Sequence, residues 1–294
     1  MPKLAKADVE LWWTTMATGE VHYTKVLDGR VTPEIYPRLR QIHSELAHEK
    51  DPVIETCGRR DGYYRLIEPL PDPINFAGLS EKLDSKIILP FNLREYAFIY
   101  NQTIILIAGA KSSGKTGFLY RTAGLNMSHL NVILLSNLEG GAEQMKDRFL
   151  GMGINLDTAP IKVYPLTTEN AHHLMKFQDS LYLIDYIDCP EGGEFYLIAG
   201  KISRINQKLK TLGNSVAIIG LQKPPGRDLA FGGAGTLKDA TLYLAMDKSR
   251  LKIVDCKVPA QEFSPNNMIW RFKYSETGTK FEEISREYGE DNEE

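Results

Sequence analysis

Residues 104–118, IILIAGAKSSGKTGF, join an apolar run to a glycine-containing turn and then to residues that favour a helix. Gly109 and Gly114 bracket the turn, and Lys115 and Thr116 complete the pattern G-x-x-x-x-G-K-[ST]. Glycines at these positions let the backbone curl so that its N–H groups face bound phosphates. The helix that follows adds a favourable dipole at its N-terminus. The segment therefore predicts a nucleotide site at the end of a buried strand.

The same segment supplies the expected ligands of the nucleotide. Lys115 is expected to reach the β- and γ-phosphate oxygens, and the Thr116 hydroxyl is expected to coordinate magnesium. ATP and Mg²⁺ are thus the expected cofactors. The residues expected to bind them are Gly109, Ala110, Ser112, Ser113, Gly114, Lys115, Thr116, Gly117 and, from a later strand, Asp185.

Two carboxylates follow later apolar strands. Glu139 ends the segment VILLSNLE, and Asp185 follows LYLI. One such carboxylate can hold magnesium through water, and another can orient and deprotonate an attacking water. A solvated loop residue and a helix cap are the structural alternatives for Glu139 and Asp185. Their order after the glycine turn favours a role in catalysis.

From residue 85 onward, apolar segments of strand length alternate with helical stretches. The strand candidates are TIILIAG, NVILLSN, SLYLIDY, SVAIIGLQ, TLYLAMD and LKIVDCK. Strands that alternate with helices form a mainly parallel sheet covered on both faces. Residues 85–286 are therefore predicted to be one α/β domain, and the acidic residues 287–294 a disordered tail.

The first 70 residues have a different pattern. Residues 6–19 and 32–50 have helical character, and residues 52–69 fit a strand, a Gly/Asp turn and a second strand. Helices followed by a small hairpin resemble the winged helix-turn-helix domain, so residues 1–70 are predicted to form such a domain. The next segment contains closely spaced prolines that disfavour helix and central strand, and residues 71–84 are predicted to be a linker.

The ordered segments GAKSSGKTGFLYRTAGLNM, LLSNLEGGAEQMKDRFL, LYLIDYI and ISRINQKLKTLGNSVAIIGLQ resemble the RecA-type P-loop ATPases, and more closely the DnaB-like helicase and RepA-like plasmid ATPase branch. The resemblance implies that Glu139 is the catalytic base, that Asp185 holds magnesium-bound water, and that Gln222 senses the γ-phosphate. Lys115, Glu139 and Gln222 are then the catalytic set. It also implies a RecA-like core that assembles into a ring or filament with ATP between subunits.

The chain departs from that branch at one position. Helicases of the branch carry a lysine and then an arginine finger in a K-x-R arrangement, whereas this chain has Lys257, Val258 and Pro259. Because losing such a finger slows hydrolysis by several powers of ten, slow turnover is expected. Lys257 is the candidate for a residue acting on the neighbouring subunit, with Lys248, Arg250 and Lys252 as alternatives nearby. The helical amino-terminal domain that collars replicative helicases is replaced by the winged-helix-like segment.

Two loops are candidate DNA contacts because the equivalent loops of RecA-like proteins line the central channel. Residues 188–195 are acidic, whereas residues 223–239 are glycine-rich and carry Lys223, Arg227 and Lys238. The second loop is suited to gripping a phosphate backbone, with a flexible surface turn as the alternative.

The amino-terminal segment offers a second set of candidate DNA contacts. Arg38 and Arg40 lie on the would-be recognition helix, and Arg59 and Arg60 lie at the hairpin tip. Residues 1–75 hold ten Lys plus Arg against twelve Asp plus Glu, a net charge of 10 − 12 = −2. Dedicated DNA-binding domains are usually more basic, so docking of a protein partner is the alternative for this segment.

Composition narrows the remaining choices. The formal net charge is −3, so any attraction to nucleic acid must be local. No apolar run approaches the roughly 18–20 residues that span a bilayer, and the start lacks the core of a signal peptide, so a cytoplasmic location without membrane contact is expected. Three scattered cysteines fit neither a disulfide framework nor a zinc site.

The sequence thus predicts a magnesium-dependent, oligomeric ATPase that acts on DNA. Helicase-like activity or DNA remodelling in replication, recombination or repair is the expected setting, including that of a mobile element. Two alternatives stay open: an ATP-controlled, sequence-specific DNA-binding regulator, and a nucleotide-dependent protein scaffold that binds no nucleic acid.

Overall fold

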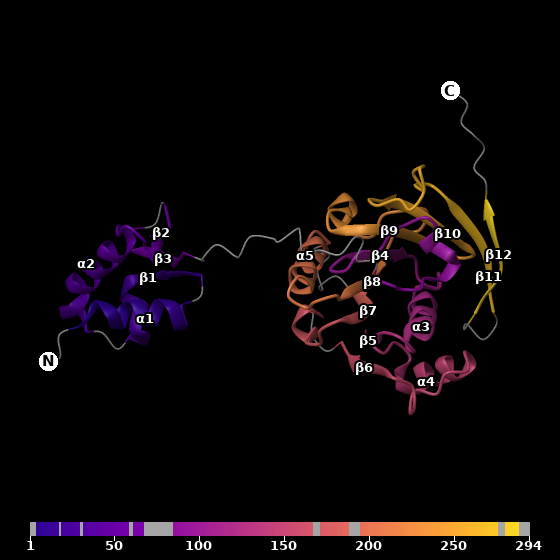
Figure 1. The fold of residues 1–294 in the computed structure, drawn as a ribbon, viewed down its shortest axis with the longest axis horizontal. Coiled ribbons are helices and arrows are strands. Elements are labelled where there is room, and N and C mark those ends of the chain that lie inside the picture. The colour runs from indigo at the N-terminus through magenta and orange to yellow at the C-terminus, as the bar shows by residue number, and fades with distance from the viewer. Residues whose placement is uncertain are drawn as a thin grey trace, which may run out of the picture. The chain divides into compact units, whose positions relative to one another are not determined.

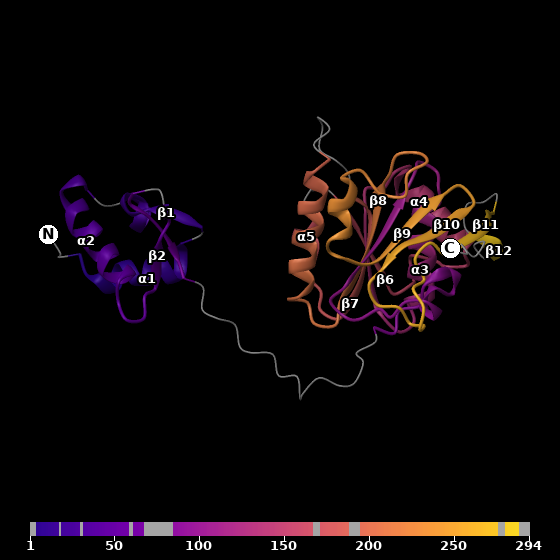
Figure 2. The ribbon, with the colours of Figure 1, turned by 90° about the horizontal axis from the view of Figure 1, so that it is seen from above.

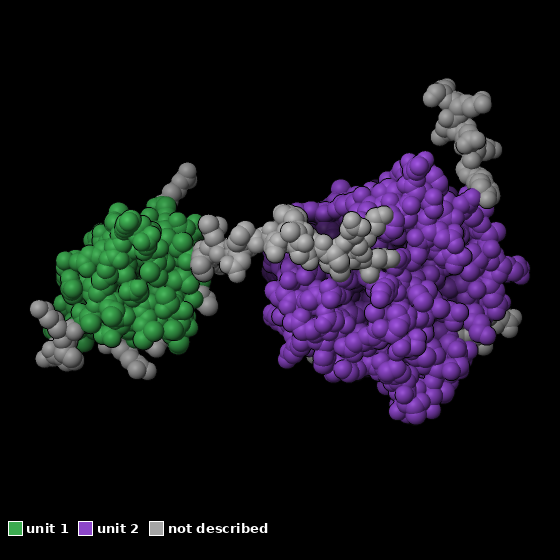
Figure 3. Space-filling model, viewed as in Figure 1, with its two compact units in different colours: residues 1–78 green, residues 79–294 purple. Residues whose placement is uncertain are grey.

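A computed structural model describes residues 4–17, 19–29, 32–58, 61–67, 85–166, 171–187, 195–275 and 280–287. The chain divides into two compact units, Met1–Gly78 and Leu79–Glu294, which Figure 3 distinguishes by colour. The predicted linker, residues 71–84, lies outside the described residues. Of the predicted tail, Glu287 is the last residue of a strand, and residues 288–294 lie outside the described part of the chain.

The first unit combines short helices with a three-stranded antiparallel sheet of order β1-β3-β2. Both predicted helices and the predicted hairpin form, whereas β1 and η1 were not expected. Its elements are α1 (Lys6–Met16), β1 (Glu20–His22), η1 (Tyr23–Gly29), η2 (Pro33–Ile35), α2 (Tyr36–Ala47), β2 (Ile54–Thr56) and β3 (Tyr63–Leu66). Its core is formed by Val9, Trp13, Val26, Leu39, Ile42, Leu46, Ile54 and Tyr64.

A polar pair lies inside this small core. The Trp13 indole Nε1 donates a hydrogen bond to His43 Nε2 over 2.9 Å, and both side chains are fully buried. Because an indole nitrogen can only donate, His43 Nε2 must be the unprotonated nitrogen. His43 Nδ1 therefore carries the proton and donates it to the Leu39 carbonyl oxygen at 2.8 Å. Burial lowers the pKa of His43, so the neutral ring is the form that the core accommodates.

The second unit is an α/β domain built on a nine-stranded sheet of order β12-β11-β10-β9-β4-β8-β7-β5-β6 among the described residues. The pairings from β9 to β6 are parallel, and β10, β11 and β12 extend the sheet past β9 in antiparallel fashion (Figure 1). The strands are β4 (Ile104–Gly109), β5 (Asn131–Ser136), β6 (Ile161–Pro165), β7 (Ser180–Ile187), β8 (Val216–Gln222), β9 (Ala240–Asp247), β10 (Arg250–Cys256), β11 (Ile269–Tyr274) and β12 (Phe281–Glu287). The helices are η4 (Pro90–Glu95), α3 (Lys115–Asn126), α4 (Gly141–Gly151), η5 (Ala171–Leu174), α5 (Leu197–Leu209) and η6 (Gly233–Leu237).

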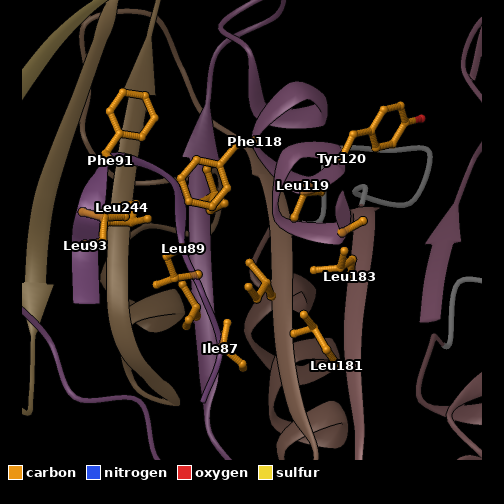
Figure 4. Close-up of a cluster of buried hydrophobic side chains, with 14 of the residues drawn as sticks. Ile87, Leu89, Phe91, Leu93, Phe118, Leu119, Tyr120, Leu181, Leu183 and Leu244 are labelled. Atoms are coloured by element: carbon orange, nitrogen blue, oxygen red, sulfur yellow. The ribbon is translucent and has the colours of Figure 1, made fainter. Parts of the chain in front are cut away.

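Helices cover both faces of this sheet, as predicted. Figure 2 shows α5 on one side and α3 and α4 on the other. Ile198, Ile202 and Ile205 lie three or four residues apart, so they form one apolar stripe of α5, and all three are buried. Burying each such side chain stabilises the fold by about 1.5–3 kcal/mol. On the opposite face, α3 residues such as Phe118 and Leu119 gather with strand residues and the segment around Leu89 (Figure 4).

The carboxyl-terminal part of the sheet differs from the sequence prediction. The segment LKIVDCK was predicted among strands of an alternating α/β pattern, but β10 pairs antiparallel with β9. Only two residues separate these strands, and a parallel crossover needs a dozen or more. Strands β6, β11 and β12 were not predicted. Both edges carry exposed charged side chains, which discourage pairing with other sheets.

Candidate functional site

The glycine turn connects the carboxyl end of β4 to the first residue of α3. Gly114 has φ of 101°, a conformation that glycine adopts without steric cost. At Gly109, a Cβ atom would collide with the side chains of Ser113 and Lys115. These two glycines let the loop close tightly over the Lys115 side chain, so the loop requires the residue types that the sequence pattern specifies.

Ser113 gives the first sign that the loop is built for a ligand. Its side chain is only 4% exposed, and within the described residues Ser113 Oγ has no hydrogen-bond partner. A buried hydroxyl without a partner costs free energy unless a ligand or water satisfies it. A phosphate oxygen is a suitable acceptor at this place.

Lys115 lies folded back under the loop. Its ammonium group donates to the carbonyl oxygens of Gly109 at 2.9 Å and Ala110 at 3.2 Å. Burial lowers the pKa of Lys115, while the negative charges of Asp185 and Glu139 raise it. A largely desolvated ammonium group beneath a glycine loop is suited to bind phosphate oxygens.

Asp185 lies against Thr116 at the start of α3. The Thr116 hydroxyl donates to Asp185 Oδ1 over 3.2 Å. Burial raises the pKa of Asp185 to about 6, against the lowering influence of Thr116 and Lys115. The residue lies inside β7, which continues to Ile187, and so it does not end its strand as predicted.

Thr116 and Asp185 fit the chemistry of a magnesium site. A hydroxyl and a carboxylate are both hard oxygen donors of the kind that Mg²⁺ prefers. Among the described residues, no group of three or more His, Cys, Asp or Glu side chains could hold a metal ion. A magnesium ion here would therefore depend on nucleotide phosphates and water for its remaining ligands, as is usual for this ion.

Glu139 lies in the loop between β5 and α4, where it is exposed. The Tyr186 hydroxyl donates to Glu139 Oε1 at 3.0 Å. The loop is tied to β7 by two further hydrogen bonds, from the Tyr186 N–H to Asn137 Oδ1 at 2.9 Å and from the Asn137 N–H to the Asp185 carbonyl oxygen at 3.0 Å. These bonds fix the position of the Glu139 carboxylate relative to Asp185.

A single cavity of about 670 Å³ brings the predicted residues together. Gln222 reaches it from the carboxyl end of β8, beside the β4 end from which the loop starts. The cavity is lined by Lys111, Ser112, Ser113, Gly114, Lys115, Thr116, Gly117, Tyr120, Ser136, Asn137, Glu139, Gly140, Gln144, Arg148, Asp185, Tyr186, Gln222 and Tyr274. Of the predicted cofactor-binding residues, Gly109 and Ala110 do not line the cavity but contribute the carbonyl oxygens that hold Lys115.

Sequence analysis missed several residues of this cavity. Tyr120 lies one turn after Thr116 on α3, Arg148 comes from α4, and Tyr274 ends β11. Tyr274 packs so closely on α3 that a Cβ atom at Gly117 would collide with its hydroxyl group. The spacing of Tyr120 from Thr116 places both on one helix face and could have identified Tyr120. Arg148 lies nine residues after Glu139, in the segment LLSNLEGGAEQMKDRFL that carries the resemblance. No local pattern identifies Tyr274, because the fold brings it in from a distant segment.

In the loop predicted to grip DNA, residues 223–239, one of the three predicted cations is not available for a DNA contact. Lys223 has a fully buried side chain whose ammonium group pairs with Asp247 Oδ1 and the Arg227 carbonyl oxygen, each at 2.6 Å. It presents no charge to a DNA backbone, and the prediction for Lys223 is corrected on this ground. The loop is also anchored rather than free, because the Tyr243 hydroxyl accepts a hydrogen bond from the Ala230 N–H at 2.8 Å. The side chains of Arg227 and Lys238 remain exposed.

Three further predicted contact residues, Arg38, Arg40 and Lys257, are not among the residues that line the cavity. Arg38 pairs with Glu45 at 3.6 Å and Arg40 with Asp61 at 3.3 Å on the first unit. Arg59 and Arg60 lie outside the described residues, as does the acidic loop up to residue 194. The Lys257 ammonium group donates to the carbonyl oxygens of Leu237 at 3.3 Å and Lys238 at 2.7 Å.

The fold and the site together define an α/β protein with a tight glycine loop at the carboxyl edge of a mostly parallel sheet. No protein-family model matches the chain, and no curated protein matches it. Among solved structures, the chain is similar to one described as "Crystal structure of the RadB recombinase", with a TM-score of 0.48 and 14% sequence identity over 64% of this chain and 93% of that chain. A likeness of this size assigns no activity and no residue role to this chain. Among the described helices, none has both the length and the apolar character that crossing a membrane requires.

Proposed function

We propose that this protein is a magnesium-dependent ATP hydrolase with a RecA-like core. The observation that carries the proposal is the cavity itself. It joins the phosphate-binding loop to Asp185, Glu139 and Gln222, which come from three different strands or the loops after them. An acidic pair and an amide facing a phosphate cradle are the parts that hydrolysis of a phosphoanhydride needs.

Each residue has a role in this proposal. Lys115 binds the β- and γ-phosphate oxygens, and Thr116 and Asp185 would hold Mg²⁺. When bound, Mg²⁺ would neutralise part of the negative charge on the phosphates. Glu139 orients the attacking water and accepts its proton, and Gln222 contacts the γ-phosphate. The hydrogen bond from Tyr186 holds Glu139 in place but also occupies one carboxylate oxygen, so the other is the proton acceptor.

DNA is the proposed substrate, and a ring or filament of identical chains is the proposed assembly. Arg227 and Lys238 are the exposed cations that support a DNA contact near the carboxyl edge of the sheet, and Lys257 remains the candidate for acting on a neighbouring subunit. The first unit has a helix, a strand, further helices and a hairpin, with β1 beside β3, an arrangement that supports a winged-helix domain. On such a domain Arg38 and Arg40 are proposed to contact DNA.

One observation favours a second candidate, the nucleotide-dependent protein scaffold. Lys223 is buried, and Arg38 and Arg40 are engaged with carboxylates of their own unit. Fewer cations are therefore available to DNA than the sequence predicts. In this case the first unit docks a protein partner.

The test measures ATP hydrolysis by the purified chain alone, with single-stranded DNA and with duplex DNA, at two salt concentrations. Lys115→Ala is expected to abolish ATP binding, and Glu139→Gln to keep binding while losing turnover by about 10²-fold or more. Lys210→Ala and Glu143→Gln are matched controls, because both side chains are exposed and do not line the cavity. Full turnover by Glu139→Gln would remove that residue from the mechanism. A slow rate that neither DNA changes favours the scaffold.

A further inference from the structure

One face of α5 carries positive charges that none of the proposed roles uses. Lys201, Arg204 and Lys208 lie three and four residues apart, so they share one face of this helix and extend about 10 Å along its axis. The helix contains no aspartate or glutamate. In a chain with a formal net charge of −3, this basic face of α5 is a local concentration of positive charge.

The basic face of α5 is separate from the nucleotide cavity. Figure 2 shows α5 on one face of the sheet, whereas α3, which follows the glycine loop, covers the opposite face. None of the described residues that line the cavity belongs to α5. Binding of a nucleotide in the cavity therefore does not explain why these cations are present.

Polar contacts on the other flank hold α5 in place. The Ser203 hydroxyl donates a hydrogen bond to Asp239 Oδ2, and Asn206 Nδ2 donates one to Asp239 Oδ1 over 2.9 Å. The helical periodicity puts Ser203 and Asn206 on the flank away from the basic face, with the buried apolar stripe between the two flanks. The carboxylate of Asp239 thus fixes the helix and leaves the basic face on a rigid element.

The short helix η5 adds two histidines next to the basic face. The rings of His172 and His173 have centroids 4.1 Å apart. Burial lowers the pKa of His172, and the positive charges of His173, Arg204 and Lys208 lower it further. Because these charges act on His172, the positive potential extends from α5 to η5.

Gly200 is exposed on α5, one turn before Arg204. A glycine inside a helix destabilises it by about 0.5–1 kcal/mol relative to alanine. No described atom lies within 4 Å of the place where a Cβ atom would be, so packing within the chain does not require a glycine here. The missing side chain lets a ligand approach the helix backbone closely next to Arg204.

We propose that the basic face of α5 binds the phosphate backbone of DNA, as a contact surface separate from the 223–239 loop. This inference rests on the proposed action on DNA and does not depend on ATP hydrolysis. Each of the three cations is expected to contact one phosphate. Such contacts position the DNA and carry no sequence information directly, so the surface is expected to bind different sequences equally.

Contacts within the chain do not prevent this role. Lys201 and Arg204 also interact with other residues of their own chain. Ion pairs at an exposed surface are worth about 0–1 kcal/mol, so a phosphate can replace contacts of this kind. The long side chains can also keep their charged ends in water while their stems lie along the helix.

The basic face changes which cations are available to DNA. Lys223 is buried, and Arg38 and Arg40 are engaged with carboxylates of the first unit. The basic face supplies three further cations from one rigid helix. A DNA contact of the second unit then depends on α5 as well as on the exposed side chains of the 223–239 loop.

The experiment measures binding of the full-length protein to a labelled single strand and to its duplex between about 50 and 200 mM salt. Lys201→Gln, Arg204→Gln and Lys208→Gln are combined in one triple variant, because glutamine removes the charge and keeps good helix propensity. Each phosphate contact contributes about 0.7–0.9 to the slope of log affinity against log salt, so the slope is expected to become shallower by about 2–3. Lys208→Gln alone is expected to change it by about 1.

A control triple variant removes the same amount of charge elsewhere. It combines Arg121→Gln, Lys146→Gln and Lys273→Gln, which change exposed residues of α3, α4 and β11, and it is expected to keep the wild-type slope. Arg204→Lys keeps the charge and is also expected to keep the slope. Thermal unfolding shows whether each variant is folded, and Lys208→Gln decides the question if the α5 triple variant is not.

The possible outcomes separate this inference from the proposed function. A wild-type slope in the α5 triple variant, or an equal change in the control triple variant, would overturn the inference alone. A wild type that binds neither form of DNA would also remove DNA as the proposed substrate. In that case ATP hydrolysis that Lys115→Ala abolishes would still support the proposed hydrolase.

Discussion

Acidification should destabilise the first unit through His43. The buried ring accepts a hydrogen bond from Trp13 at Nε2 and donates one to Leu39 from Nδ1. A second proton would place two donors, His43 Nε2 and Trp13 Nε1, against each other inside an apolar core. The groups facing the ring are Trp13, Tyr23 and Tyr64, with His22 near enough to disfavour a positive charge. No carboxylate is among these neighbours to stabilise a charged imidazole.

The sign of the effect follows from the lowered pKa. His43 in the folded unit has a pKa below its ordinary value of 6.5, whereas the unfolded chain regains that value. Below pH 6.5 the unfolded state therefore binds more protons than the folded state, and stability falls as the pH falls. The slope approaches about 1.4 kcal/mol per pH unit until the pH reaches the folded pKa. In a small domain with a total stability of about 5 kcal/mol, a loss of this kind is measurable.

The assay is urea denaturation of the full chain between pH 7.5 and 5.0, followed by tryptophan fluorescence. Trp12 and Trp13 lie in the first unit and Trp270 in the second, so a Trp270→Phe background reports on the first unit alone. His43→Gln retains an acceptor for Trp13 but cannot titrate, and it should lose the slope below pH 6.5. His48→Gln, at the exposed C-cap position of the same helix, should keep the slope. The same slope in His43→Gln and in the parent would refute the reasoning.

Two further predictions concern the second unit. Asp185→Asn should raise the magnesium concentration that supports ATP turnover by about 10–100-fold. Turnover of the parent should fall as the pH drops through about 6, where Asp185 becomes neutral, while the variant should show no such step there. A magnesium titration at several pH values measures both effects, and an unchanged magnesium requirement would contradict the assigned role. Lys223→Met should destabilise the second unit by about 3 kcal/mol, because it leaves Asp247 and the Arg227 carbonyl without their partner. It should leave DNA affinity per folded molecule unchanged. Trp270 fluorescence and DNA binding test this beside the exposed control Lys210→Met, and a stable Lys223→Met protein that loses DNA binding would restore Lys223 as a contact.

The parts of the site that are local in sequence could be predicted, and the parts that depend on tertiary packing could not. The glycine loop is specified by a fixed spacing, since each glycine meets a steric demand within a few residues. Glu139 and Gln222 follow or end buried strands, and neighbouring strand ends meet at one edge of a parallel sheet, so their convergence could also be expected. Tyr274 reaches the cavity from β11, which no spacing relates to the loop.

Lys223 shows a second limit of sequence analysis. A lysine in a glycine-rich loop has the composition of a surface contact, but composition does not show where the charge lies after folding. Here Asp247, at the end of β9, draws the ammonium group inward. The antiparallel pairing of β9 and β10, in contrast, was accessible from the sequence, because the two residues between them are too few for a parallel crossover.

The Lys223–Asp247 pair also connects the carboxyl edge of the sheet to the proposed nucleotide site. The Lys223 N–H donates to the carbonyl oxygen of Gly109, the first residue of the glycine loop, at 3.2 Å, and its positive charge lowers the pKa of Lys115. Directly before it, Gln222 lines the cavity. A displacement of the 223–239 loop would therefore change the backbone next to Gln222 and the electrostatics at Lys115 together. A ligand that contacts Arg227 or Lys238 on this loop has a short physical route to the phosphates, even though Lys223 itself does not touch the ligand.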